Sequence, residues 1–150
     1  MLREDLQNSL KEAMKAKNVK TVNAVRLIIA AMKEKDVEAR GKGLEKASDT
    51  DLLAMMQSMI KQRNESIKIY LDGKRPDLAQ KEQDEIDVIS NFLPKQMNAA
   101  EIEAAIRDVI AKTGASSIKD MGKVMSVIKA EYAGKMDFAA ASAVVKSVLA

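Results

Sequence analysis

The sequence contains no cysteine and no histidine. Without cysteine it forms no disulfide and offers no thiolate for metal binding or nucleophilic catalysis. Without histidine it lacks the most common general base and the most common metal ligand of proteins. Carboxylates, lysine, tyrosine and serine are the remaining candidates for chemistry. We therefore expect no catalytic residue, no metal and no cofactor.

Aromatic side chains are also scarce, with two tyrosines and two phenylalanines in 150 residues. Alanine, leucine, isoleucine, methionine, lysine, glutamate and glutamine dominate, a composition typical of helices rather than sheets. We predict an all-α protein with about twice the usual one-third share of helix. No apolar run approaches the ~20 residues of a membrane-spanning helix, and the charged start predicts neither signal peptide nor anchor. The sequence favours a cytoplasmic protein without a membrane partner.

Four long helices are predicted in the first part of the chain. Apolar residues at three- and four-residue steps indicate helices over 2–17 and 20–39, the second ending toward the glycines of 40–43. Candidate N-caps at 48–51 open a third helix that runs to Asp72, with a stripe at Leu53, Met56, Ile60, Ile67 and Tyr70. Pro76 begins a fourth helix that Pro94 stops, and the short connection predicts an antiparallel hairpin.

Three shorter helices are predicted in the rest of the chain. Asn98 and Glu101 have the spacing of a capping box at the start of the first. Gly114 and two serines separate it from a second helix, with Ile118, Met121, Met125 and Ile128 on its apolar stripe, and Gly134 precedes the third. We predict an N-terminal subdomain resembling a four-helix bundle at 1–94 and a C-terminal three-helix bundle at 95–150.

Arg63 falls on the apolar stripe of the third predicted helix. A guanidinium buried there costs several kcal/mol unless a carboxylate pairs with it. Glu82 and Glu85 lie on the helix expected to pack against it, so the simpler hypothesis is an internal ion pair among Arg63, Glu82 and Glu85 that sets the register of the hairpin. The functional alternative is an anion site.

Gly122 lies inside the sixth predicted helix, where glycine costs about 1 kcal/mol relative to alanine. This predicts a close approach to its backbone, either by a neighbouring helix or by the phosphate backbone of a bound partner. Lys119 and Lys123 flank it one turn apart, and Ser117 stands at the expected helix start. A helix start presents free N–H groups and partial positive charge. Ser117, Lys119, Gly122 and Lys123 are the candidate nucleic-acid contacts.

Several motifs, spread over nearly the whole chain, resemble the GatB/YqeY family. Their combination is unusual enough to make the match specific. The motifs include Gln62-Arg63-Asn64-Glu65-Ser66, Gly73-Lys74-Arg75-Pro76-Asp77-Leu78-Ala79, Phe92-Leu93-Pro94-Lys95-Gln96 and Asp120-Met121-Gly122-Lys123-Val124-Met125. The chain is similar to a free-standing YqeY protein, because it has no room for the catalytic and ATP-dependent portions of a full amidotransferase subunit.

The resemblance implies a non-catalytic accessory module associated with tRNA and tRNA-dependent amidotransfer. In this family the C-terminal part resembles the tail of the GatB amidotransferase subunit, and a related module is attached to some glutaminyl-tRNA synthetases. One alternative is a protein-interaction module that docks on an amidotransferase or aminoacyl-tRNA synthetase, with an exposed apolar patch where the bundles meet. A further alternative, from the family label alone, is a carbon–nitrogen ligase with glutamine as amide donor.

Overall fold

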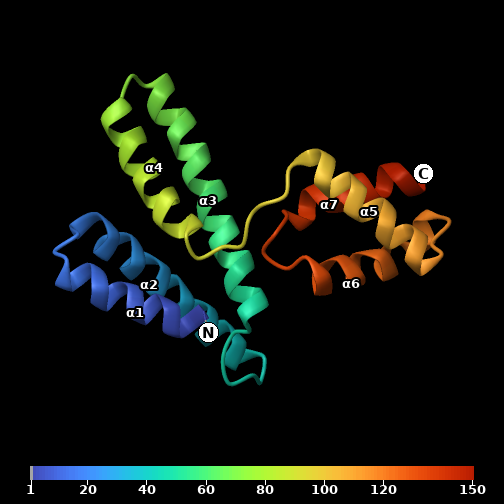
Figure 1. The fold of residues 1–150 in the computed structure, drawn as a ribbon, viewed down its shortest axis with the longest axis horizontal. Helices are drawn as coiled ribbons and strands as arrows, with labels where there is room; N and C mark the ends of the chain where they lie inside the picture. Colours follow the sequence, from blue (N-terminus) through green and yellow to red (C-terminus); the bar gives the residue numbers. More distant parts are fainter. Residues whose placement is uncertain (1) are drawn as a thin grey trace. The chain divides into compact units, whose positions relative to one another are not determined.

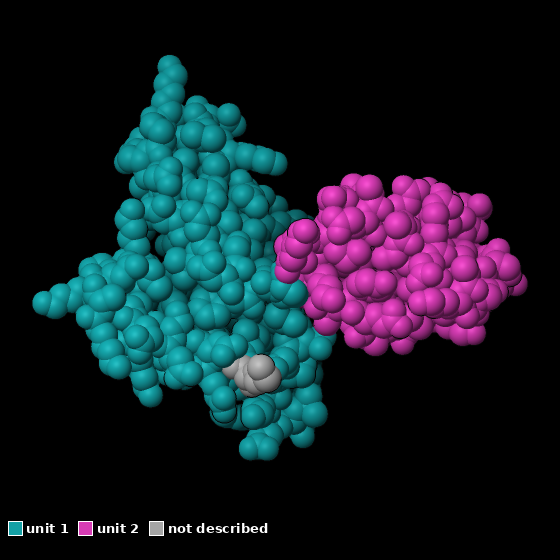
Figure 2. Space-filling view, viewed as in Figure 1, with its two compact units in different colours: residues 1–94 teal, residues 95–150 magenta. Residues whose placement is uncertain are grey.

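The computed structural model describes residues 2–150 and is built of helices (Figure 1). Helical residues account for 79% of it, and residues 2–150 contain no strand. The prediction of an all-α protein is confirmed. The chain divides into two compact units, residues 1–94 and residues 95–150 (Figure 2). Each unit closes a separate apolar core, one beginning at Leu2 and the other at Ala105.

Unit 1 consists of two helical hairpins. Its helices are α1 (Leu2–Lys15), α2 (Val19–Gly41), α3 (Asp49–Asp72) and α4 (Pro76–Ser90). Helix α2 contacts the other three, and α3 packs chiefly against α4, as the predicted antiparallel hairpin requires (Figure 1). The most deeply buried side chains of the core are Leu6, Val25, Ile28, Leu52, Met56 and Ile89.

The buried side of α3 differs from the predicted stripe. The buried residues are Leu52, Met55, Met56 and Met59, all in its first half, whereas four of the five predicted stripe residues are only half-buried. The first half of α3 belongs to the four-helix core, but its second half extends with α4 as a two-helix hairpin (Figure 1). A single stripe counted along the whole helix could not reflect this change of partners.

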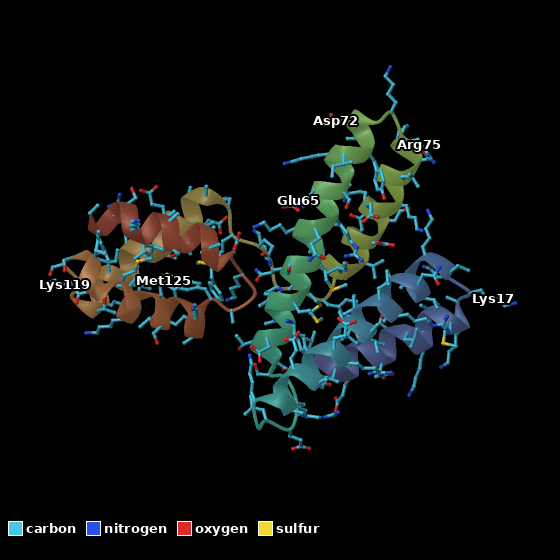
Figure 3. All side chains as sticks on the ribbon, turned by 180° about the vertical axis from the view of Figure 1, so that it is seen from behind. Lys17, Glu65, Asp72, Arg75, Lys119 and Met125 are labelled. Atoms are coloured by element: carbon cyan, nitrogen blue, oxygen red, sulfur yellow. The ribbon has the colours of Figure 1, made fainter. Side chains whose placement is uncertain are left out.

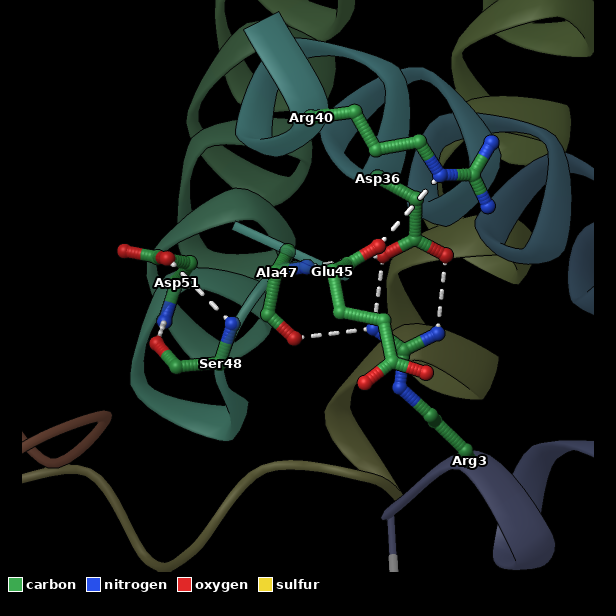
Figure 4. Close-up of polar contacts among 7 residues, drawn as sticks. All are labelled: Arg3, Asp36, Arg40, Glu45, Ala47, Ser48 and Asp51. Atoms are coloured by element: carbon green, nitrogen blue, oxygen red, sulfur yellow. Dashed lines mark hydrogen bonds and ion pairs between the residues drawn. The ribbon is translucent and has the colours of Figure 1, made fainter. Parts of the chain in front are cut away.

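A network of hydrogen bonds and one ion pair joins the start of α1 to α2 and to the chain between α2 and α3 (Figure 4). The guanidinium of Arg3 donates to both carboxylate oxygens of Asp36, at 2.8 and 2.7 Å, and to the carbonyl of Ala47 at 2.8 Å. Asp36 also accepts from the backbone N–H of Ala47 at 2.9 Å. The Arg3 guanidinium, followed by the Ala47 amide, holds the pKa of Asp36 far below the usual aspartate range.

Unit 2 is a bundle of three helices with a short 3-10 turn. Its elements are α5 (Ala99–Thr113), η1 (Ile118–Asp120), α6 (Met121–Glu131) and α7 (Phe138–Leu149). Asn98 caps α5 by accepting from the N–H of Glu101 at 2.9 Å. On the sixth helix the prediction was partly wrong, because Val124 and Ile128 are buried while Ile118 is 48% exposed. The 3-10 turn has about three residues per turn, so it shifts the phase of a stripe counted from Ile118.

We predict that Asp36→Asn lowers the free energy of unfolding by about 1–3 kcal/mol, because Arg3 loses a charge-assisted partner. A carboxyl whose pKa is depressed by folding stabilises the protein above its unfolded pKa of about 3.9 and loses that contribution as the pH falls. Urea unfolding at several pH values should therefore show that the free energy of unfolding falls less steeply with decreasing pH for the variant than for the parent. Glu65→Gln, at an exposed position on α3, is the control, and equal losses for both variants would contradict the prediction.

Candidate nucleic-acid interface

The candidate interface lies on the connection between α5 and α6. Gly114 ends α5 in the left-handed region, with φ of +69°, and Ser117 is extended before η1. The carboxylate of Asp120 accepts from the backbone N–H groups of Ser116 and Ser117, at 3.0 and 3.4 Å. These N–H groups lower the pKa of Asp120, that of Ser116 contributing most. The carboxylate of Asp120, the one acid between Gly114 and Lys123, is therefore bound to backbone N–H groups of the loop.

Lys119 and Lys123 are both exposed on this connection. Among residues 2–150, neither lysine takes part in an ion pair between side chains within 4.0 Å. The ammonium of Lys123 donates to the carbonyl of Thr113 at 3.3 Å, and Lys119 stands at the turn that enters α6 (Figure 3). The arrangement presents two exposed lysines, four residues apart, without a side-chain ion pair in the described chain.

Gly122 does not lie in the interior of a helix, as the sequence suggested. It is the second residue of α6, because residues 118–120 form a separate 3-10 turn. A Cβ built on Gly122 would meet nothing within 4 Å, so no helix within residues 2–150 packs closely on it. The predicted close packing is wrong, and what remains is an exposed backbone without a side chain between two lysines.

The expectation of free N–H groups at this helix start is only partly met. The N–H groups of Ser116 and Ser117 donate to Asp120, that of Asp120 to the carbonyl of Ser117, and that of Met121 to the carbonyl of Ile118. The 3-10 turn and the Asp120 side chain use these donors internally. The candidate interface therefore offers lysine cations and an open backbone surface rather than a ring of free amides.

Arg63 lies in unit 1, on the face of α3 toward α4. Its Nε donates to Glu85 at 2.9 Å and one terminal nitrogen donates to the carbonyl of Met59 at 3.1 Å. The side chains of Arg63 and Glu85 are 14% and 17% exposed, so the pair is largely shielded from water. Glu82, one turn earlier on α4, is half-buried and does not join the pair. The geometry fits a register-setting contact between α3 and α4.

Unit 1 also contains an open groove of about 530 Å³ between α2 and α3, which the sequence did not predict. Ala39, Ala47, Met55 and Met59 contribute to it, and Lys35 pairs with Glu38 at its edge at 3.0 Å. The groove depends on how far α2 stands from α3, a spacing that no local pattern encodes. Within residues 2–150, no three histidine, cysteine, aspartate or glutamate side chains gather as metal ligands.

The apolar residues near the boundary of the two units are packed into separate cores. Phe92 and Leu93 pack on the core of unit 1, and Met97 packs on that of unit 2. The apolar patch expected for a docking module stays a prediction. In the described part of the chain, no helix is long and apolar enough to traverse a bilayer.

Comparison with known proteins settles the family. The family described as Yqey-like protein matches residues 3–149. The chain belongs to this family. Similar curated proteins include the yeast protein named altered inheritance of mitochondria protein 41, mitochondrial. The protein of Saccharomyces cerevisiae strain YJM789 is 35% identical over 98 residues, which are 65% of this chain and 51% of the relative.

Two further proteins with this name come from other yeasts. The one from Lachancea thermotolerans is 33% identical over 110 residues, covering 72% of this chain and 57% of the relative. The one from Candida glabrata is 36% identical over 88 residues, covering 59% and 47%. The matched part of this Yqey-like chain therefore spans about half the length of these relatives.

We predict that Arg63→Ala lowers the free energy of unfolding of the Yqey-like chain by about 2–4 kcal/mol, because Glu85 keeps a shielded charge without its partner. Arg75→Ala is the matched control in the same unit. The side chains of its pair with Asp77 are 57% and 63% exposed, so water screens the pair and its loss should cost little stability. Denaturant unfolding of both variants checks the prediction, which fails if Arg63→Ala costs no more than the control.

Proposed function

We propose that this Yqey-like protein is a non-catalytic helical accessory module associated with tRNA and tRNA-dependent amidotransfer. The observation that carries the proposal is that Lys119 and Lys123 are exposed, form no ion pair with another side chain within residues 2–150, and lie beside the open backbone of Gly122. Lysine cations supply the sequence-independent part of nucleic-acid binding through phosphate contacts and counterion release. Double-helical RNA is recognised by shape and phosphate contacts, which require no aromatic stacking platform.

Charge around the site supports this choice over the exposed face of α5. On α5, Arg107 pairs with Glu103 at 2.9 Å and Lys112 pairs with Asp108 at 2.9 Å, so these cations are partly compensated. At the start of α6, the nearby acid is Asp120, whose carboxylate binds backbone amides. A phosphate approaching Gly122 would meet two ammonium groups and no bulky side chain.

The link with amidotransfer comes from the resemblance of the C-terminal part to the tail of the GatB subunit. On this proposal the module holds tRNA for a separate enzyme, which performs the chemistry. Its own role needs only exposed cations and a rigid support. The core around Val109, Val124 and Ile128 supplies that support.

We expect Lys119→Gln/Lys123→Gln to weaken the binding of bulk tRNA and to reduce the slope of log K against log salt by about one to two units. The reduction follows because each lysine that contacts a phosphate releases about one counterion. Fluorescence titration of the full chain over a salt series measures both quantities. The control Lys129→Gln/Lys146→Gln removes the same charge from exposed positions of unit 2. Equal slopes for the two double variants would refute the assignment.

Gly122 provides a steric test of the same site. Gly122→Ala should raise the stability of unit 2 by up to about 1 kcal/mol, because the added Cβ meets no neighbour and restricts the unfolded chain. Gly122→Leu should fold equally well yet weaken tRNA binding, because its side chain stands where a phosphate would approach. Thermal unfolding and tRNA titration separate the two effects. Unchanged tRNA affinity in Gly122→Leu would rule out close approach at this position.

A further inference from the structure

The two hairpins of unit 1 end in turns of the same unusual form. After α1, the N–H of Lys17 donates to the carbonyl of Met14 at 3.2 Å, and the N–H of Asn18 donates to that of Ala13 at 2.9 Å. After α3, the N–H of Lys74 donates to the carbonyl of Leu71 at 3.1 Å, and the following N–H donates to that of Tyr70 at 2.8 Å. Both are Schellman motifs, the bonding pattern that commonly closes a helix at a glycine.

In both turns a lysine occupies the position that favours glycine. The φ angles of Lys17 and Lys74 are +56° and +58°, in the left-handed region where a Cβ is strained. Residues held in such conformations cluster at functional sites. Both lysines are exposed, and neither forms an ion pair within the described chain.

Exposed aliphatic side chains accompany these lysines. Met14 and Val19 beside the first turn are 52% and 66% exposed, and Ile69 and Leu71 beside the second are 69% and 55% exposed. They are four of the eight large apolar residues exposed in residues 2–150, so half of that set lies at two turns. Lys68, also exposed and without an ion pair, adds a cation next to Ile69.

The two turns are the tips of the two hairpins of unit 1 (Figure 1). Lys20, just after the first turn, reaches Asp84 on α4 at 3.1 Å, which places the α1–α2 turn along the side of the α3–α4 hairpin. Figure 3 shows Lys17 at the tip of one hairpin and Asp72 and Arg75 at the tip of the other. The open groove of unit 1 lies elsewhere, between α2 and α3.

We propose that the turns around Lys17 and Lys74 form a peripheral docking surface for an anionic lipid bilayer. Free ammonium groups complement anionic headgroups, and the neighbouring aliphatic side chains can enter the interfacial region of the lipid. A nucleic acid would use the lysines but gain little from aliphatic side chains, and the one aromatic residue at these turns, Tyr70, is half-buried. Contact of this kind needs no membrane-spanning helix.

Vesicle flotation with the full chain tests the proposal. We expect the protein to bind vesicles of phosphatidylcholine and phosphatidylserine, and to bind pure phosphatidylcholine vesicles far less. Lys17→Gln/Lys74→Gln should lower the affinity for the mixed vesicles about tenfold, because each lysine near an anionic surface contributes appreciably. Val19→Gln/Ile69→Gln should also weaken binding while leaving the charge unchanged.

Matched controls remove the same groups away from the turns. Lys33→Gln/Lys61→Gln deletes two exposed lysines without ion pairs, and Val37→Gln changes an aliphatic side chain that is 63% exposed near the far end of α2. These variants should bind vesicles as the parent does. Lys17→Gly/Lys74→Gly should lose vesicle binding but show an unchanged or higher Tm, which separates a docking defect from misfolding.

Three outcomes would overturn the proposal. The first is equal binding to the two kinds of vesicle, and the second is equal loss in the turn and control lysine variants. The third is a turn variant that loses bulk tRNA binding but retains vesicle binding, which would assign the turns to RNA. Because the proposed tRNA contacts at Lys119 and Lys123 are intact in every turn variant, failure of this surface and failure of the proposed function are distinguishable.

Discussion

The arrangement of unit 1 depends on the contact among Arg3, Asp36 and Ala47. It joins the first turn of α1, the later part of α2 and the chain that enters α3, three segments that are far apart in sequence. The carboxylate of Asp36 accepts from the Arg3 guanidinium and from the N–H of Ala47, and the guanidinium also donates to the carbonyl of Ala47. Because the Asp36 side chain is only 13% exposed, water competes weakly for these bonds.

This contact also determines where α3 begins relative to α2. Ser48, immediately after Ala47, caps α3 in a reciprocal box with Asp51. Fixing Ala47 therefore fixes the first turn of α3, and with it the position of Leu52 and Met56 in the core. The groove between α2 and α3 includes Ala47 and lies beside this junction. The ion pair of Arg63 with Glu85 holds α4 against α3. The turns at the tips of the two hairpins take no part in these contacts.

Both proposed surfaces rely on cations at turns rather than on a pocket. Many basic side chains in this protein are compensated by neighbouring acids, as Lys20 is by Asp84 and Arg107 is by Glu103. Some lysines without such partners, among them Lys17, Lys74 and Lys119, stand on connections between helices, whereas others such as Lys33 lie within helices. Loops carry function in this way because a rigid scaffold can position them without constraining their sequence. Interactions of this kind weaken with salt, since exposed charges are screened within about 10 Å.

The sequence by itself determined the helical class, most helix ends and the family, because these depend on local signals. Caps such as Asn98 and Ser48, the break at Pro94 and the glycine after α5 act on their own turn of backbone. Tertiary structure alone decided the partner of Arg3, which is 33 residues away, and the choice of Glu85 over Glu82. It also decided which residues of α3 are buried and whether Gly122 is crowded. These features depend on the packing of helices from distant parts of the chain, and the periodicity of one helix carries no information about where its neighbours end.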